Sequence, residues 1–313
     1  MQTRHRLSPA RVIACTLAFT MTAIAGGCGM PRVDGVAESQ QTFSACESAF
    51  YAASAHHDTV FAAAAPLIER YYAAVSAESE WLDVAAGCEN RMQEGALRSA
   101  QSGMAAWRLK QRLDAADDDY SGSSSALDAT ALSALSPQSE QSKQANQPDQ
   151  SQDGTTVTPK QLTTMSLAED RAGFALELLA ARGASGASLT LSDHHKTIAQ
   201  QLISAAQAAD HAASDPRQKV YAIDQLIANP DSATDPATGL HASTTAIIEI
   251  DCAREELGVF ADDSAATGTE GTSDAAALGT IDPTRRALAL LAATRAKQAF
   301  ALGYPSGDYA LFR

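Results

Sequence analysis

Long alanine-rich runs without helix breakers are the feature that most constrains the fold of this chain. Alanine supplies 66 of the 313 residues, and it has the highest helix propensity of the amino acids. Aromatic residues make up only 5% of the chain, whereas β-sandwiches and β-barrels rely on aromatic and β-branched side chains. We therefore predict an all-α protein whose helices approach closely over small side chains and leave little cavity for chemistry.

The first 27 residues have the pattern of a secretory signal peptide. A basic start precedes an apolar run, Val12 to Ile24, which is too short to cross a hydrocarbon layer of about 30 Å. The run leads into Ala25-Gly26-Gly27-Cys28, which resembles the lipobox of bacterial lipoproteins. This resemblance implies cleavage before Cys28 and lipidation of that cysteine on the extracytoplasmic face of the membrane. The usual box has leucine where Ala25 stands, and ordinary cleavage after Ala25 followed by secretion is the alternative.

The acidic charge balance excludes nucleic acid as a partner and leaves Cys28 as the residue that would contact the membrane. The chain has 23 Lys and Arg against 37 Asp and Glu, and nucleic-acid binding needs a basic surface. Removal of residues 1–27 takes away three arginines and no acid, which moves the net charge from −14 to −17. Anionic lipids repel such a protein, so membrane attachment would depend on Cys28.

Residues 42–116, which follow a short tether at 28–41, are predicted to form a small helical module. Phe43–Ser76 and Ser79–Asp114 are nearly free of breakers. Pro66 should interrupt the first segment, because proline removes a backbone hydrogen bond and clashes with the preceding turn. The second segment is expected to carry one buried stripe at spacings of three and four. Its members are Trp81, Ala85, Cys88, Met92, Ala96, Ser99, Gly103 and Trp107.

Three cysteines follow the lipidation site: Cys46, Cys88 and Cys252. A disulfide is permitted outside the cytoplasm, and we expect Cys46 and Cys88 to pair. A straight helix over 43–76 would hold these two about 30 Å apart, so the bond requires a chain that reverses at Pro66 and then reverses again. The alternative is two free, buried cysteines that behave as small apolar side chains. Cys252 is left unpaired, and core packing is its expected role.

From 117 to 157 the composition changes to Ser, Asp, Gln, Asn and Pro. Such a segment buries too little apolar surface to offset the entropy of ordering, so we predict a disordered linker. Asp117 to Asp119 lack the spacing and the glycine of an EF-hand loop, and we interpret them as a solvated acidic run.

The C-terminal half, 158–313, is predicted to be a four-helix bundle. Start signals at Thr158-Pro159 and Asp282-Pro283 and stop signals at Gly183 and Gly303 delimit its helices. The expected helices cover 159–182, 192–214, 243–261 and 282–303, with a short outer helix over 220–228 and a loose loop over 262–281. One long connection between the second and third helices is typical of ferritin-like bundles, where it makes these two helices parallel.

A resemblance supports this architecture. The run Ser166–Leu176, the pair His195-Lys196 and the helix order resemble an uncharacterised ferritin-like domain family of high-GC Gram-positive bacteria. The resemblance covers 158–313, and it implies the ferritin-like fold and no established activity.

The bundle helices carry too few ligands for a pair of metal ions. Ferritin-like di-iron sites use a Glu from each of two helices and a Glu-x-x-His from each of the other two. The second and fourth predicted helices contain no Glu, and the fourth contains no His, so we predict that no metal binds. Glu169 and Arg295 fall on core stripes at about the same level, where we expect a buried ion pair, joined by Glu256 and His195.

Two alternatives stay open for these residues. Arg295 could extend to solvent and leave Glu169 half exposed. A reduced carboxylate and histidine site could instead hold di-iron or manganese, which would make the protein a metal-binding or redox enzyme. The residues of that site would be Glu169, His195, Glu249 and Glu256.

The chain lacks the common catalytic motifs. No nucleophile elbow, phosphate loop, paired Cys-x-x-Cys or His-Glu-x-x-His occurs, so nucleophilic and zinc catalysis have no support. We predict a non-enzymatic binding or structural element of the cell envelope, with the membrane contacted through Cys28 and an envelope protein as partner. A small ligand in a groove of the bundle is a third alternative.

Overall fold

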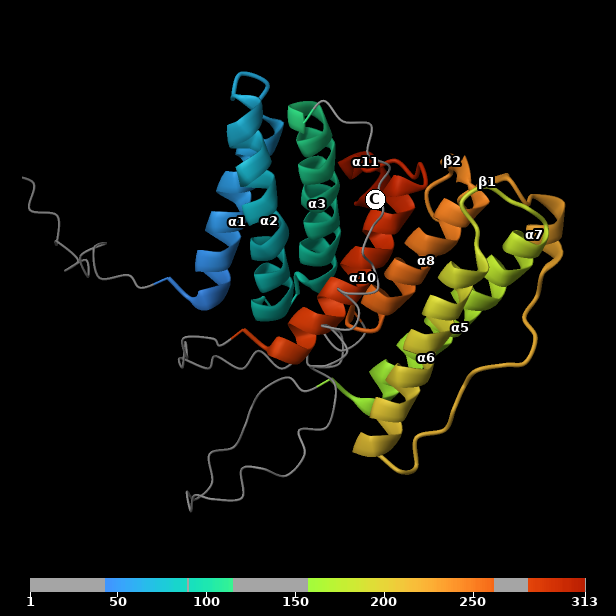
Figure 1. Cartoon of the computed structure of the whole chain (residues 1–313). Helices are drawn as coiled ribbons and strands as arrows, with labels where there is room; N and C mark the ends of the chain where they lie inside the picture. Colours follow the sequence, from blue (N-terminus) through green and yellow to red (C-terminus); the bar gives the residue numbers. More distant parts are fainter. Residues whose placement is uncertain (1–42, 89, 115–156, 262–280, 313) are drawn as a thin grey trace, which may run out of the picture. The chain divides into compact units, whose positions relative to one another are not determined.

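The computed structural model describes residues 43–88, 90–114, 157–261 and 281–312. The described chain is helical apart from two short strands (Figure 1), which confirms the all-α class. The predicted signal peptide, the lipidation site Cys28, the tether, the linker up to residue 156 and most of the 262–281 loop lie outside the described residues.

Three antiparallel helices form the N-terminal part: α1 (Ala45–Phe61), α2 (Leu67–Gly87) and α3 (Met92–Asp114). The Ser44 hydroxyl accepts from the Glu47 backbone N–H, and the Glu47 side chain accepts from Ser44 in return, so a capping box starts α1. The interruption predicted at Pro66 is present, since Pro66 is the residue that precedes the first turn of α2.

The second reversal lies elsewhere than predicted. Helix α2 continues through 76–79, where the sequence holds no breaker, and ends at Gly87, so Ser79–Asp114 is not one helix. The expected stripe is therefore divided between two helices that face each other. Gly95 on α3 lies directly against the α2 backbone, and a Cβ added there would be 2.5 Å from the Trp81 carbonyl oxygen and 2.6 Å from the Ala85 nitrogen.

Four longer helices follow: α5 (Pro159–Ala181), α6 (Leu189–Ala209), α8 (Thr244–Gly258) and α10 (Pro283–Ala301). The predicted starts of α5 and α10 agree with the structure. Helix α6 begins three residues before the predicted Ser192, because Ser188 caps it by accepting from the Leu191 N–H. It ends at Ala209 rather than near 214.

The connection from α6 to α8 contains more structure than expected. The short helix α7 covers Asp224–Ala228, within the predicted 220–228. Strands β1 (Ser232–Thr234) and β2 (His241–Ser243) then form an antiparallel hairpin, with Ala233 opposite Ala242, that was not predicted. A last helix, α11 (Asp308–Leu311), was also missed.

Contacts between helices fix the relative directions of α5, α6 and α8. The hydroxyls of Ser166 and Ser192 on α5 and α6 donate to Ala199 and Gly173 on the opposite helix, so these two helices are antiparallel. Gln161 bonds to the Val259 carbonyl, whereas Ala172 packs against Cys252, so α5 and α8 are also antiparallel. Helices α6 and α8 therefore run parallel across their long connection.

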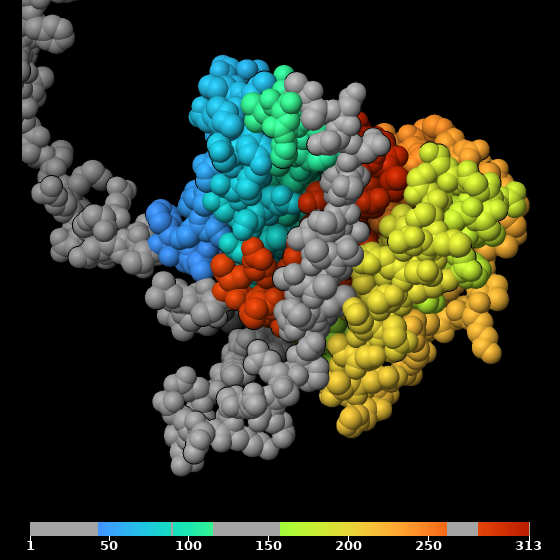
Figure 2. Space-filling model, in the orientation of Figure 1, coloured from blue at the N-terminus to red at the C-terminus, as the bar shows by residue number. Residues whose placement is uncertain are grey.

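One hydrophobic core joins the two halves of the chain. Helix α10 packs against α8 and also against α2 and α3 (Figure 1). Leu97 and Met104 on α3 belong to the same buried cluster as Leu202, Ile250 and Leu288, and the described residues from Phe43 onward belong to one compact unit. The predicted module at 42–116 and bundle at 158–313 thus share their interior. On the face of the molecule shown in Figure 2, helices α1 and α2, in blue and cyan, are exposed at the surface.

Candidate functional site

Five ionisable side chains meet in the space between the four longer helices. They are Glu169 from α5, His195 from α6, Glu249 and Glu256 from α8, and Arg295 from α10, and each is 0% exposed. Charged groups are rarely buried without partners, because leaving water costs several kcal/mol per ion. The arrangement of these five groups, called the charge cluster below, therefore depends on how they satisfy one another.

Glu169 lies at the centre of the charge cluster. Arg295 donates from Nε to Glu169 Oε1 over 2.8 Å, and His195 Nδ1 lies 2.5 Å from Glu169 Oε2. On the far side of the imidazole, His195 Nε2 is 3.2 Å from Glu249 Oε1. The stripe positions predicted this ion pair, and the alternative in which Arg295 reaches solvent and Glu169 is half exposed does not occur.

The pKa values favour the charged form of the pair between Glu169 and His195. Burial alone would raise the pKa of Glu169. The charges of Arg295 and His195 and a hydrogen bond with Glu256 lower it by more, so the pKa is about 2. Burial and Arg295 lower the pKa of His195, whereas Glu169 and Glu249 raise it by more. A protonated His195 donates to both carboxylates and holds α5, α6 and α8 together.

The charge cluster does not fit a pair of metal ions. A di-iron centre of the ferritin type needs carboxylates from all four helices and two imidazoles, whereas α6 contributes only His195 and α10 contributes Arg295. The guanidinium bonds to Glu169, the carboxylate most central to such a site. The structure does bring together the alternative ligand set of Glu169, His195, Glu249 and Glu256. However, the positively charged guanidinium of Arg295 lies beside these residues.

Cys252 belongs to the same region, although the sequence assigned it only to core packing. It is free and buried. One oxygen of Glu169, one nitrogen of His195 and the Cys252 sulfur all lie within 4.8 Å of one another. Burial, followed by the charge of Glu169, raises the pKa of the thiol well above its usual value. The positions 249, 252 and 256 share one face of α8 at spacings of three and four, and this spacing could have revealed Cys252.

A shallow pocket of about 160 Å³ lies between α5 and α8 and reaches Cys252. Small side chains line its inner part, and Arg171, Asp251 and Glu255 lie at its mouth. A second hollow, of about 460 Å³, lies between α1, α3 and the segment before α11, with His57, Gln101 and Asp308 among its lining residues.

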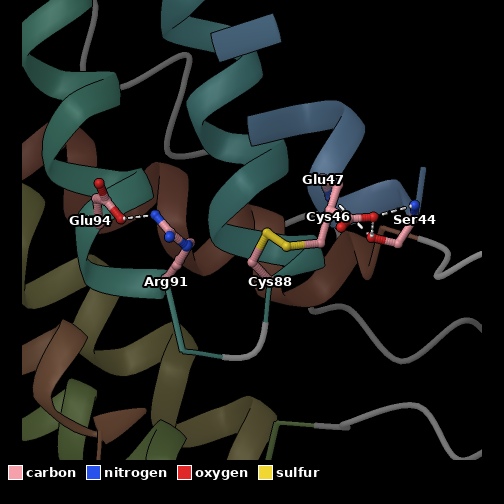
Figure 3. Close-up of a disulfide and its surroundings, with 6 residues drawn as sticks. All are labelled: Ser44, Cys46, Glu47, Cys88, Arg91 and Glu94. Atoms are coloured by element: carbon pink, nitrogen blue, oxygen red, sulfur yellow. Dashed lines mark hydrogen bonds and ion pairs between the residues drawn. A yellow bond between two sulfur atoms is a disulfide. The ribbon is translucent and has the colours of Figure 1, made fainter. Parts of the chain in front are cut away.

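A disulfide joins Cys46 near the start of α1 to Cys88 just after α2 (Figure 3). The bond is the pair expected from the sequence, and the two free cysteines of the alternative are not present. The capping box of Ser44 and Glu47 lies on one side of it, and the ion pair of Arg91 and Glu94 lies on the other. The disulfide thus ties the beginning of the described chain to the turn between α2 and α3.

A second polar network was not predicted, and it fixes the β-hairpin. Asp235 is fully buried and accepts hydrogen bonds from Tyr304, from Thr238 and from Arg254 on α8. Burial alone would raise the pKa of Asp235. The hydrogen bonds from Tyr304, Thr238 and Arg254 lower it by more, so the pKa is about 2. This network connects the hairpin with α8 and with the C-terminal segment.

Comparisons with known proteins add no assignment. No family model, no curated protein and no solved structure matches the chain. Among the described residues, no helix is both long enough and apolar enough to span a membrane.

Proposed function

We propose that this chain is a lipid-anchored, extracytoplasmic protein of the cell envelope that acts by binding a protein partner rather than by catalysis. The predicted signal peptide and the resemblance of residues 25–28 to a lipobox support the location. The disulfide between Cys46 and Cys88 agrees with it, because such bonds persist mainly in oxidising compartments.

We also propose that α5, α6, α8 and α10 form a ferritin-like bundle. The antiparallel pairs, the parallel α6 and α8 and the single long connection between these two support that topology. The convergence of side chains from all four helices on one buried point is a further argument. In this interpretation the charge cluster stands where related bundles would hold two metal ions.

The observation that carries the binding proposal is an apolar stripe on α2. Ile68, Tyr72 and Val75 follow one another at spacings of four and three, and all three are exposed, Tyr72 by 63%. Exposed apolar patches on a soluble surface mark interaction sites. The chain is strongly acidic, which disfavours an anionic lipid surface as the occupant, so we assign the stripe to a protein partner.

The charge cluster supports a non-catalytic role. Its charged groups are bonded to one another, which favours fixed positions over the proton exchange that an acid or base catalyst needs. The side chains of the charge cluster hold the four longer helices together, and the exposed apolar stripe on α2 is left to bind the partner.

Two measurements on cells that express the chain test the proposal. Labelled palmitate should be incorporated into the protein and should be lost in Cys28→Ala, which should appear in the medium. A photo-crosslinking amino acid at Tyr72 should give a discrete protein product that disappears when Ile68→Asp and Val75→Asp are added. The matched position is Ser204, which is exposed on α6. An identical pattern of products from both positions would contradict the binding proposal.

A further inference from the structure

We propose that Glu169, His195 and Cys252 bind one zinc ion. The site is distinct from the apolar stripe and does not depend on the partner-binding proposal. It is also distinct from a two-metal carboxylate centre, because it takes a single ion and includes a thiolate.

The three ligands come from three helices and offer three different donor atoms. The ligand atoms lie within 4.8 Å of one another, and all three residues are buried. Zinc accepts carboxylate oxygen, imidazole nitrogen and thiolate sulfur in one tetrahedral site. The thiolate argues against magnesium, calcium and manganese, which prefer oxygen ligands.

The neighbours of Glu169 and His195 already hold them in position for metal binding. Arg295 holds Glu169 Oε1, and Glu249 faces His195 Nε2. The remaining two atoms, Glu169 Oε2 and His195 Nδ1, point at each other over 2.5 Å. A metal-bound histidine commonly donates its other ring N–H to a carboxylate, which is the relationship of His195 to Glu249. In the metal-free protein a proton lies between Oε2 and Nδ1, and the ion would replace it as these atoms move apart.

The exchange conserves charge. One zinc ion, with two positive charges, displaces one proton from the imidazolium of His195 and one from the thiol of Cys252, and no electrons are transferred. The total charge of the buried groups is therefore unchanged, and Arg295 keeps its bond to Glu169. Burying one extra uncompensated charge would cost several kcal/mol, and this exchange avoids it.

An entrance to the site is present. Glu249 faces the Nε2 side of the imidazole, so it is the outer partner of His195 and not a ligand, and the fourth position on zinc would be left to water. The pocket between α5 and α8 reaches Cys252 from the surface, with Asp251 and Glu255 at its mouth to attract cations.

Titration of the EDTA-treated full chain with Co²⁺, followed by competition with Zn²⁺, tests the site. We expect one ion per chain and a thiolate-to-cobalt charge-transfer band in the near ultraviolet, which Zn²⁺ abolishes. Cys252→Ala should lose the band and bind Zn²⁺ at least about tenfold more weakly. Ser102→Ala, another buried small-residue change, on α3, should behave as the wild type.

The outcomes are decisive even if a variant is unstable. Absence of the band in the wild-type chain would overturn the proposal, as would an unchanged affinity in a folded Cys252→Ala or a stoichiometry of two ions per chain. If Cys252→Ala does not fold, Glu249→Gln takes its place, with the band retained and the affinity lowered about tenfold or more; an unchanged affinity in that variant would contradict the site.

Discussion

Arg295 Nε and Glu169 Oε1 are 2.8 Å apart at full burial, although 126 residues separate them in the sequence. The bond links α10 to α5, and through His195 it extends to α6 and α8. Together, these three contacts connect all four longer helices.

Loss of one partner should be costly. Arg295→Met leaves the buried Glu169 carboxylate without its guanidinium, so the free energy of unfolding should fall by about 3–5 kcal/mol. Chemical denaturation of the two proteins measures the change. Exposed Arg182→Met, just after α5, is the matched control and should change stability by less than about 0.5 kcal/mol.

Removal of both partners should cost less than the sum of the single losses. Glu169→Leu with Arg295→Met takes both charges out of the interior, and the coupling in a double-mutant cycle should be about 0.5–3 kcal/mol. Strictly additive effects would show that the two side chains do not stabilise each other.

The Asp235 network should produce part of the acid sensitivity of the fold. The pKa of Asp235 is about 2 in the folded protein, below the ordinary value of 3.8. The stabilising contribution is therefore complete above pH 3.8 and disappears as the pH falls through about 2. The stability difference between the wild type and Asp235→Asn should be largest near pH 5 and shrink toward pH 2. A constant difference over that range would contradict the assignment.

The disulfide should stabilise the fold by limiting the unfolded chain. Cys46 and Cys88 enclose a separation of 42 residues, so Cys46→Ser with Cys88→Ser should lower the free energy of unfolding by about 2–4 kcal/mol. Reduction of the wild-type protein should reproduce the loss, while the double variant should be insensitive to reductant.

The contact between α2 and α3 depends on the absence of a side chain at Gly95. Gly95→Ala would force a methyl group into the α2 backbone, and a loss of about 1–3 kcal/mol is expected. Gly258→Ala is the matched control, because nothing lies within 4 Å of its added Cβ. That change should raise stability by up to about 1 kcal/mol. Equal losses at both positions would contradict the close approach.

Local signals explain which parts of the fold were predictable. Thr158 and Asp282 cap helices that start where the sequence places them. The three-four spacing also placed Glu169 and Arg295 on facing stripes. The turn before α3 was misplaced because the prediction divides the chain between Ser76 and Ser79, although Ala77 and Glu78 favour a helix and the chain turns only after Gly87.

The features that the sequence missed depend on distant residues. The core shared by Leu97 and Leu288 has no local pattern, since it forms only when α3 packs against α10. The β-hairpin is fixed by the buried bond between Asp235 and Tyr304, 69 residues apart. Cys252 looked like any small core residue until α5 and α6 brought Glu169 and His195 beside it.

The metal content of the chain purified from the cells that produce it shows directly whether a charge cluster built on Glu169 and Arg295 takes the place of a two-metal centre. Elemental analysis should find no pair of iron or manganese ions and at most one zinc ion per chain. Two iron or manganese ions per chain would contradict the account.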